Sequence, residues 1–188
     1  MKLVRTAAAL AGGAFLAWQS VGVFLALLER RPGSLALTVL VAWIFNMFVT
    51  GAFALPGFVL PTHRLAPAAY YRVRRPGRLR AVCGALGVGP FRRALLATLW
   101  RDPGMQRRFF DGTPAGLKRM EAETRSAEFG HALPFLLITA ASVAWAAAGG
   151  VRLAVAATAF NVLGNFYPVL LQRLHRARLV RVLGRARG

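Results

Sequence analysis

Residues 6–28 read TAAALAGGAFLAWQSVGVFLALL, an apolar run that contains no charged residue. A helix of about 20 apolar residues is long enough to cross the hydrocarbon core of a bilayer. Lys2 and Arg5 precede the run, and Glu29 and Arg30 end it. The apolar part of a cleaved signal peptide would be shorter and would end in small residues, so we expect an uncleaved first membrane span.

Three further apolar runs follow along the chain, at residues 34–60, 132–148 and 153–171. Pro56 is expected to kink or end the second run, because proline cannot donate the backbone hydrogen bond that a helix needs. Gly149 and Gly150 separate the third run from the fourth. The pattern predicts an all-α fold, an integral membrane bundle of four transmembrane helices that forms a single membrane domain over residues 1–188.

Basic residues are kept apart from the apolar runs. The chain is 56 % hydrophobic and yet carries a formal net charge of +19. Of its 25 Lys and Arg residues, 22 fall in three segments, residues 1–5, 61–131 and 172–188. Because cytoplasmic loops of membrane proteins are enriched in Lys and Arg, we expect a multi-pass protein with both termini cytoplasmic. With this orientation, residues 61–131 form a basic cytoplasmic segment and residues 172–188 form a basic C-terminal tail.

The basic cytoplasmic segment contains one amphipathic pattern. Residues 91–100 read FRRALLATLW, in which Phe91, Leu95 and Leu99 share one face of a helix and the arginines lie off it. This pattern is typical of a helix that lies in the membrane interface. A strongly basic chain can also bind nucleic acid. No DNA- or RNA-binding motif is present, however, so we expect membrane lipids and anionic head groups at the inner face as partners, and no nucleic acid.

Ionisable side chains next to the third apolar run form the first half of a candidate site. Steps of four, three, four and three residues place one set on a single helix face: Leu117, Glu121, Thr124, Glu128 and His131. A carboxylate three residues before His131 could fix the tautomer of the imidazole and raise its basicity. The imidazole could then take a proton from an attacking hydroxyl.

Amide side chains in the fourth apolar run form the second half. Asn161 and Asn165 are four residues apart and therefore share a helix face. Their amides could hold a carbonyl oxygen or bind the Glu128–His131 pair. Tyr167-Pro168 follows and should perturb the helix, because Pro168 frees a backbone carbonyl that needs another partner. A purely structural interpretation stays open, in which both pairs only hold helices together, the asparagines at about 0.6–2 kcal/mol each.

The sequence does not favour a metal site. Glu128-x-x-His131 is half of a di-iron bundle motif, but that motif needs a second copy and two further glutamates. Cys83 is the chain's single cysteine, which excludes a zinc site built from several cysteines. We therefore expect neither a metal nor a bound cofactor.

Two sequence blocks carry a resemblance to a known family. They read ExETRxAExxH over residues 121–131 and NxxxNxYPxxxQRxxRxRL over residues 161–179. Together they resemble the glycosyl-4,4'-diaponeurosporenoate acyltransferase (CrtO) family of small bacterial integral membrane proteins, over about residues 107–183. The named member attaches a fatty acyl chain to a glycosylated carotenoid acid.

The resemblance implies a membrane-embedded acyltransferase of the bacterial cell (inner) membrane that acts in carotenoid biosynthesis. It would move a fatty acyl group from a co-substrate such as acyl-CoA to a hydroxyl of a lipophilic acceptor. Mapped onto this sequence, His131 would be the general base, Glu128 its orienting partner, and Asn161 or Asn165 the oxyanion donor. The remaining polar residues of the two blocks are candidate substrate ligands: Glu121, Arg125, Tyr167, Gln172, Arg173 and Arg176. Alternatives are a membrane-bound methyl or isoprenoid transferase, and a non-catalytic helical membrane protein that binds lipid or a partner.

Overall fold

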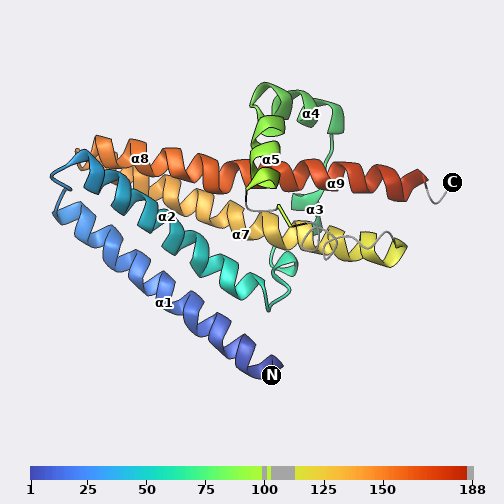
Figure 1. Cartoon of the computed structure of the whole chain (residues 1–188), viewed down its shortest axis with the longest axis horizontal. Coiled ribbons are helices and arrows are strands. Elements are labelled where there is room, and N and C mark those ends of the chain that lie inside the picture. The colour runs from blue at the N-terminus through green and yellow to red at the C-terminus, as the bar shows by residue number, and fades with distance from the viewer. Residues whose placement is uncertain (99–100, 103–112, 186–188) are drawn as a thin grey trace. The chain divides into compact units, whose positions relative to one another are not determined.

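The structure is a computed structural model of the chain, and it describes residues 1–98, 101–102 and 113–185. Every regular element in these ranges is a helix (Figure 1), which confirms the predicted all-α class. The chain divides into two compact units. The first unit contains Met1–Thr62 and Phe129–Pro168, and the second contains His63–Glu128 and Val169–Gly188. The prediction of a single membrane domain stays a prediction.

Four helices are long and apolar enough to cross a membrane, as the sequence predicted. They comprise Lys2–Glu29, Leu35–Gly57, Ala115–Ala147 and Val151–Leu179. The third helix starts well before the predicted residue 132, because the polar face of residues 117–131 is helical and runs directly into the apolar run. The fourth extends beyond residue 171, because the basic tail is itself helical as far as Arg185. These helices support a membrane protein, while its orientation stays a prediction.

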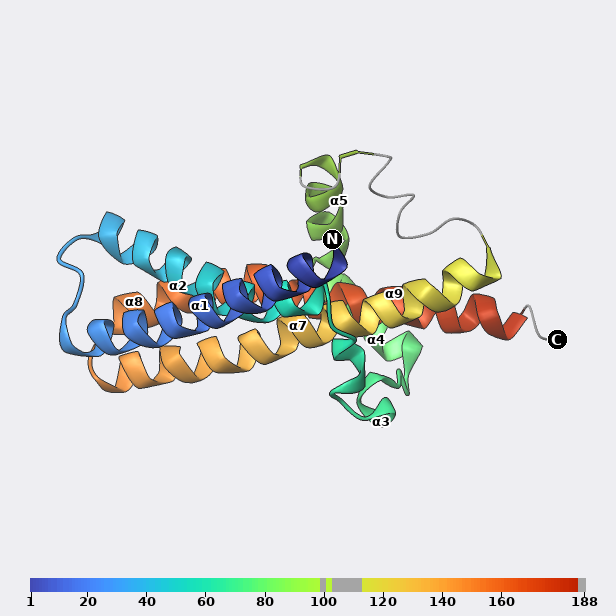
Figure 2. The same cartoon turned by 90° about the horizontal axis from the view of Figure 1, so that it is seen from below.

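In the first unit, helix α1 (Lys2–Glu29) and helix α2 (Leu35–Gly57) lie side by side and antiparallel (Figures 1 and 2). The Ser34 hydroxyl caps the start of α2 by accepting a hydrogen bond from the backbone of Leu37. The two helices approach closely at Gly13, where a Cβ atom would lie 2.8 Å from Pro56 Cγ. Small residues at helix contacts allow this close approach in membrane bundles.

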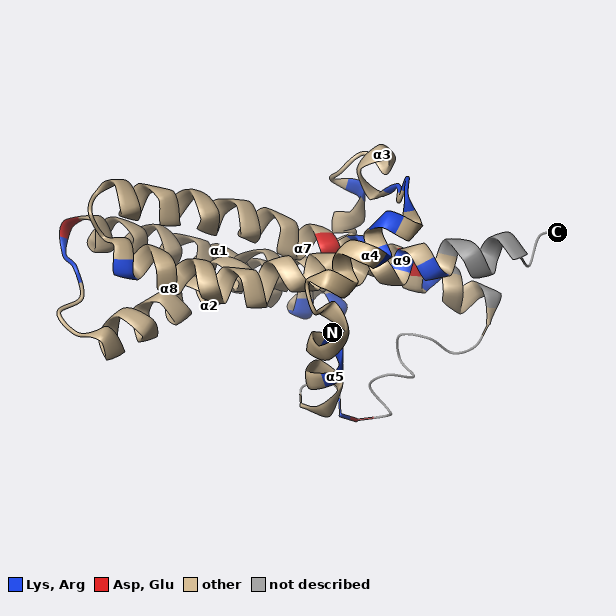
Figure 3. Cartoon of the chain, turned by 90° about the horizontal axis from the view of Figure 1, so that it is seen from above, with Lys and Arg blue, Asp and Glu red and all other residues tan. Residues whose placement is uncertain are grey.

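The apolar end of α7 (Pro114–Ala147) and helix α8 (Val151–Asn161) complete the first unit. Gly149 lies between them with φ of 82°, a left-handed conformation that glycine adopts without strain. The Trp145 ring packs at 5.6 Å from Phe24 and at 4.8 Å from Phe45, and these contacts join α7 to α1 and α2. Figure 3 shows that α1 and α2 carry no charged residue along their apolar lengths, whereas the loop that joins them is charged.

A π-helical segment, η2 (Val162–Phe166), separates α8 from α9 (Tyr167–Arg185). Pro168 has no backbone N–H, so the carbonyl of Gly164, four residues earlier, loses its α-helical partner. A single π-turn inside a helix is a common response to such a break and often marks a functional site. The predicted perturbation at Tyr167-Pro168 is therefore confirmed.

The second unit is built from short helices and the polar parts of α7 and α9. A turn of 3₁₀ helix, η1 (Thr62–Arg64), leads to α3 (Ala68–Tyr71), α4 (Pro76–Ala85) and α5 (Val88–Ala97). Gly87, with φ of 70°, makes the tight turn between α4 and α5. Helix α5 confirms the helix predicted from the pattern at residues 91–100, although residues 99 and 100 lie outside the described ranges.

Candidate active site

A buried polar network lies in the core of the first unit. The His131 side chain on α7 places Nδ1 3.1 Å from Oδ1 of Asn165 in η2. The Asn165 Nδ2 group donates to Oδ1 of Asn161, at 3.1 Å, and to Oγ1 of Thr50 on α2, also at 3.1 Å. Both asparagines are 1 % exposed. The structure therefore brings together three of the four residues that the sequence predicted to be catalytic.

The direction of these hydrogen bonds is fixed by a backbone carbonyl. Asn161 Nδ2 lies 2.9 Å from the carbonyl oxygen of Phe135, which can only accept. Asn161 therefore donates through Nδ2 and presents Oδ1 to Asn165, whose own Nδ2 must be the donor. The Oδ1 atom of Asn165 then faces His131 as an acceptor. The hydrogen between the last two groups belongs to Nδ1 of His131.

The π-segment supplies a second acceptor near the imidazole. The Gly164 carbonyl, which Pro168 leaves without its helical donor, lies close to the His131 ring. Both groups that η2 turns toward the ring, this carbonyl and Oδ1 of Asn165, are acceptors. The Asn165 acceptor at Nδ1 sets the tautomer in which the neutral ring donates through Nδ1 and keeps Nε2 as a hydrogen-bond acceptor.

Glu128 is the buried carboxylate of the second unit. Its side chain is fully buried, and its Oε1 accepts a hydrogen bond of 2.8 Å from Nε of Arg173. Its Oε2 pairs with Nη2 of Arg176, whose side chain is 2 % exposed. A buried carboxylate needs such partners, because its desolvation costs several kcal/mol. Arg173 and Arg176, from the sequence block at residues 161–179, are thus the partners of Glu128, which belongs to the block at residues 121–131.

Two tyrosines of α3 complete this arginine–glutamate cluster. The Tyr71 ring lies between two guanidinium groups, with the Cζ atoms of Arg125 and Arg176 at 5.5 and 5.3 Å from its centre. The Tyr71 backbone carbonyl accepts a 2.9 Å hydrogen bond from Nε of Arg176. The Tyr70 ring lies 5.1 Å from Cζ of Arg173. Sequence reasoning missed both tyrosines, for which the adjacent aromatic pair before a basic cluster was the only signal.

Ionisation of the two tyrosines is suppressed by their surroundings. Burial raises the pKa of Tyr70 and of Tyr71, and the negative charge of Glu128 raises both further. Both hydroxyls are therefore protonated at neutral pH. Among the described residues, the buried Tyr71 hydroxyl and Nη1 of Arg176 have no hydrogen-bond partner, so the cluster retains unused donors.

The other predicted ligands lie in less enclosed places. Arg125 pairs with Glu121 at 2.5 Å, one turn apart on α7, and both side chains are partly exposed. The Tyr167 ring packs edge-on against Phe166 at 6.3 Å. Gln172 is half-buried on α9. Within the described ranges no three His, Cys, Asp or Glu side chains gather as metal ligands.

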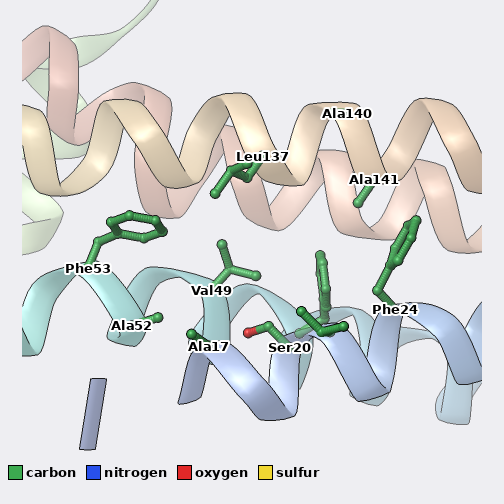
Figure 4. Close-up of a pocket in the computed structure, with 11 residues that line it drawn as sticks. Ala17, Ser20, Phe24, Val49, Ala52, Phe53, Leu137, Ala140 and Ala141 are labelled. Carbon is green, nitrogen blue, oxygen red and sulfur yellow. The ribbon is translucent and has the colours of Figure 1, made fainter. Parts of the chain in front are cut away.

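The first unit also contains an apolar cavity of about 410 Å³ between α1, α2 and α7 (Figure 4). Figure 4 shows Phe53 and Val49 of α2 facing Leu137 of α7 across this space. Its one polar lining residue, Ser20, donates its hydroxyl to the carbonyl of Leu16 at 2.7 Å and so does not present a free donor. The lining suits a hydrocarbon chain and no charged group.

A family model described as glycosyl-4,4'-diaponeurosporenoate acyltransferase (CrtO) matches residues 67–185. The matched region begins just before the two tyrosines and includes both polar networks except Thr50. No curated protein and no solved structure matches the chain. Because the family match covers more than half of the sequence, this chain belongs to the CrtO family, and that membership supports an acyltransferase of carotenoid biosynthesis.

Proposed function

We propose that this protein is a membrane-embedded acyltransferase that moves a fatty acyl group onto a hydroxyl of a lipophilic acceptor, such as a glycosylated carotenoid. The observation that carries the proposal is the hydrogen bond between Nδ1 of His131 and Oδ1 of Asn165. It sets the imidazole in the tautomer whose Nε2 can take a proton.

In the proposed reaction the acceptor hydroxyl gives its proton to Nε2 of His131 while its oxygen attacks the acyl carbonyl carbon. The new C–O ester bond forms, the C–S bond of the thioester breaks, and the leaving thiolate takes the proton back from the imidazolium. Oδ1 of Asn165 stabilises the imidazolium through the Nδ1 hydrogen. The proposal thus gives the positioning role for His131 to Asn165, because Glu128 already pairs with Arg173 and Arg176.

Stabilisation of the oxyanion is assigned to an asparagine amide, as the sequence suggested. Both hydrogens of Asn165 Nδ2 are engaged, one with Asn161 and one with the Thr50 hydroxyl. A substrate oxygen can replace the Thr50 hydroxyl as the second acceptor without breaking the chain that orients His131. A hydrogen-bond donor at this position contributes about 10²–10³ in rate in enzymes that form tetrahedral intermediates.

The acyl donor is proposed to be an anionic thioester such as acyl-CoA. Glu128 would position Arg173, whose side chain is 35 % exposed, to meet the donor's anionic part. The apolar cavity of the first unit offers surroundings suited to a hydrocarbon tail. The hydrophobic acyl donor and the lipophilic acceptor could then react without leaving the bilayer.

The decisive experiment replaces His131 with glutamine, which has a similar volume but cannot act as a base at neutral pH. Membranes with the wild-type protein, His131→Gln or the control His63→Gln are supplied with labelled acyl-CoA and a carotenoid glycoside extract. Acyl transfer should fall by about 10²-fold or more in His131→Gln. It should be unchanged in the control, because the hydrogen bonds of His63 found in the described ranges join it to Ser126, outside the proposed site. Equal transfer by all three proteins would refute the assignment.

A further inference from the structure

A second pocket, separate from the arginine–glutamate cluster, lies between α5 and α9 in the second unit. It has a volume of about 230 Å³. Three arginines, a histidine and small or apolar residues line it: Val88, Gly89, Arg92, Arg93, Leu171, Leu174, His175 and Arg178. Its volume is below the range of about 300–1,000 Å³ that is usual for drug-sized ligands, so it fits one compact group.

The charges of this pocket are uncompensated within the described ranges. No carboxylate is among its lining residues, and none of the ion pairs found there includes Arg92, Arg93 or Arg178. The positive charges of Arg92 on α5 and of Arg178 on α9 both act on the His175 side chain. Like charges held together in a recess repel one another unless an anion joins them.

The start of α5 also favours the binding of an anion in this pocket. Val88 and Gly89 are the first two residues of this helix, no side chain caps it, and Pro90 follows them. The first backbone N–H groups of a helix have no partner within the helix and favour an anion. A Cβ atom at Gly89 would meet nothing within 4 Å, so this glycine leaves open space beside those N–H groups.

We propose that this pocket, lined by Arg92, Arg93, His175 and Arg178, binds the phosphate group of a phosphate ester. Guanidinium groups bind phosphate oxygens through two parallel hydrogen bonds, and three arginines line this pocket. The side chains of Leu171 and Leu174 give the pocket an apolar wall for the carbon skeleton next to the phosphate. Two sources share this chemistry, coenzyme A and an anionic phospholipid; only the first of them rests on the proposed acyl-CoA-dependent function.

The test compares two variants that each remove two positive charges from exposed arginines of the second unit. Arg92→Gln/Arg178→Gln removes pocket residues, and Arg78→Gln/Arg80→Gln on α4 is the matched control. The full chain is purified in detergent micelles. Affinity for coenzyme A and for dephospho-coenzyme A is measured by calorimetry, and retention of phosphatidylglycerol against phosphatidylcholine is measured by native mass spectrometry.

The pocket variant should lose about tenfold or more in affinity for one of the two phosphate sources, and the control should lose much less. Loss of coenzyme A binding identifies the thioester donor's phosphates as the ligand. Loss of phosphatidylglycerol alone identifies a lipid head group. Equal changes in both variants, or none, would overturn the proposal.

Two further arms keep the result interpretable. Gly89→Ala leaves every charge in place and adds one methyl group in open space, and it should weaken the same ligand. Unaltered elution and thermal unfolding of each variant show that the fold is intact. These binding assays do not involve the His131 reaction, so failure of the proposed transfer chemistry would leave their outcome unchanged.

Discussion

The Nδ1 atom of His131 lies 3.1 Å from Oδ1 of Asn165, and the two residues come from different helical segments, 34 positions apart. A chain of donors anchored on the Phe135 carbonyl directs the Asn165 oxygen toward the ring. This contact makes Asn165 a positioning residue in the proposed mechanism, while His131 is the residue that would move the proton.

Asn165→Ala should therefore reduce kcat by about 10²-fold or more with little change in KM, because it removes both the group that positions the base and the proposed oxyanion donor. The control is Asn46→Ala, which removes another buried asparagine of the first unit. Asn46 donates to the Ala42 and Ala157 carbonyls, at 2.9 and 3.2 Å, and no hydrogen bond found among the described residues joins it to the proposed site. Both variants should lose a similar stability, about 0.6–2 kcal/mol. Steady-state acyl transfer separates them, and equal losses of kcat would argue for a structural role.

Pro168→Ala should impair the reaction without touching a side chain of the network. The alanine N–H can bond to the Gly164 carbonyl, which favours continuous α-helix over the π-segment. That change rotates Asn165 relative to His131 and removes an acceptor from the ring. We expect lower acyl transfer together with unchanged or higher thermal stability. Activity equal to wild type would mean that the π-segment does not matter for positioning.

Glu128→Gln should destabilise the protein by about 3–5 kcal/mol, because it leaves Arg173 and the buried Arg176 without a counter-charge. Glu121→Gln is the matched control. Its pair with Arg125 also joins a carboxylate to a guanidinium, but both side chains are partly exposed, so its loss should cost at most about 1 kcal/mol. Denaturation followed by circular dichroism in detergent measures both values. Similar midpoints for the two variants would contradict the burial argument.

Alkaline pH should destabilise the second unit through its tyrosines. The pKa of Tyr70 and of Tyr71 is raised in the folded protein, so each folded tyrosine holds its proton more tightly than the unfolded chain does. Stability is then fully present below the ordinary tyrosine pKa of 10.0 and is lost as pH rises through the higher folded value. The double variant Tyr70→Phe/Tyr71→Phe should show a smaller loss of stability above that pH. Ultraviolet titration of the wild type should also show tyrosines that ionise late.

The four membrane-length helices could be predicted from the sequence because their signal is local. Each apolar run is charge-free and long enough to span a bilayer, whatever the rest of the chain does. The same holds for the shared helix face of Glu128 and His131, since a spacing of three fixes it within a helix. A perturbation of the helix at Tyr167-Pro168 was also predicted, because a missing N–H acts only four residues away, but its π-helical form was not.

Partner choice within the site was decided by the tertiary structure alone. The sequence offered Glu128 and the two asparagines as partners of His131. Hydrogen bonds depend on distances near 3 Å between groups from separate segments, and spacing along one helix does not determine these. In the folded protein Glu128 pairs with Arg173 and Arg176, and His131 forms a hydrogen bond with Asn165. The Tyr71 ring contacts two arginines. The sequence by itself determined which chemical groups are present and on which helix faces, because helical periodicity is local. The pairing of these groups was decided only by the tertiary structure, because it depends on how segments distant in the chain pack together.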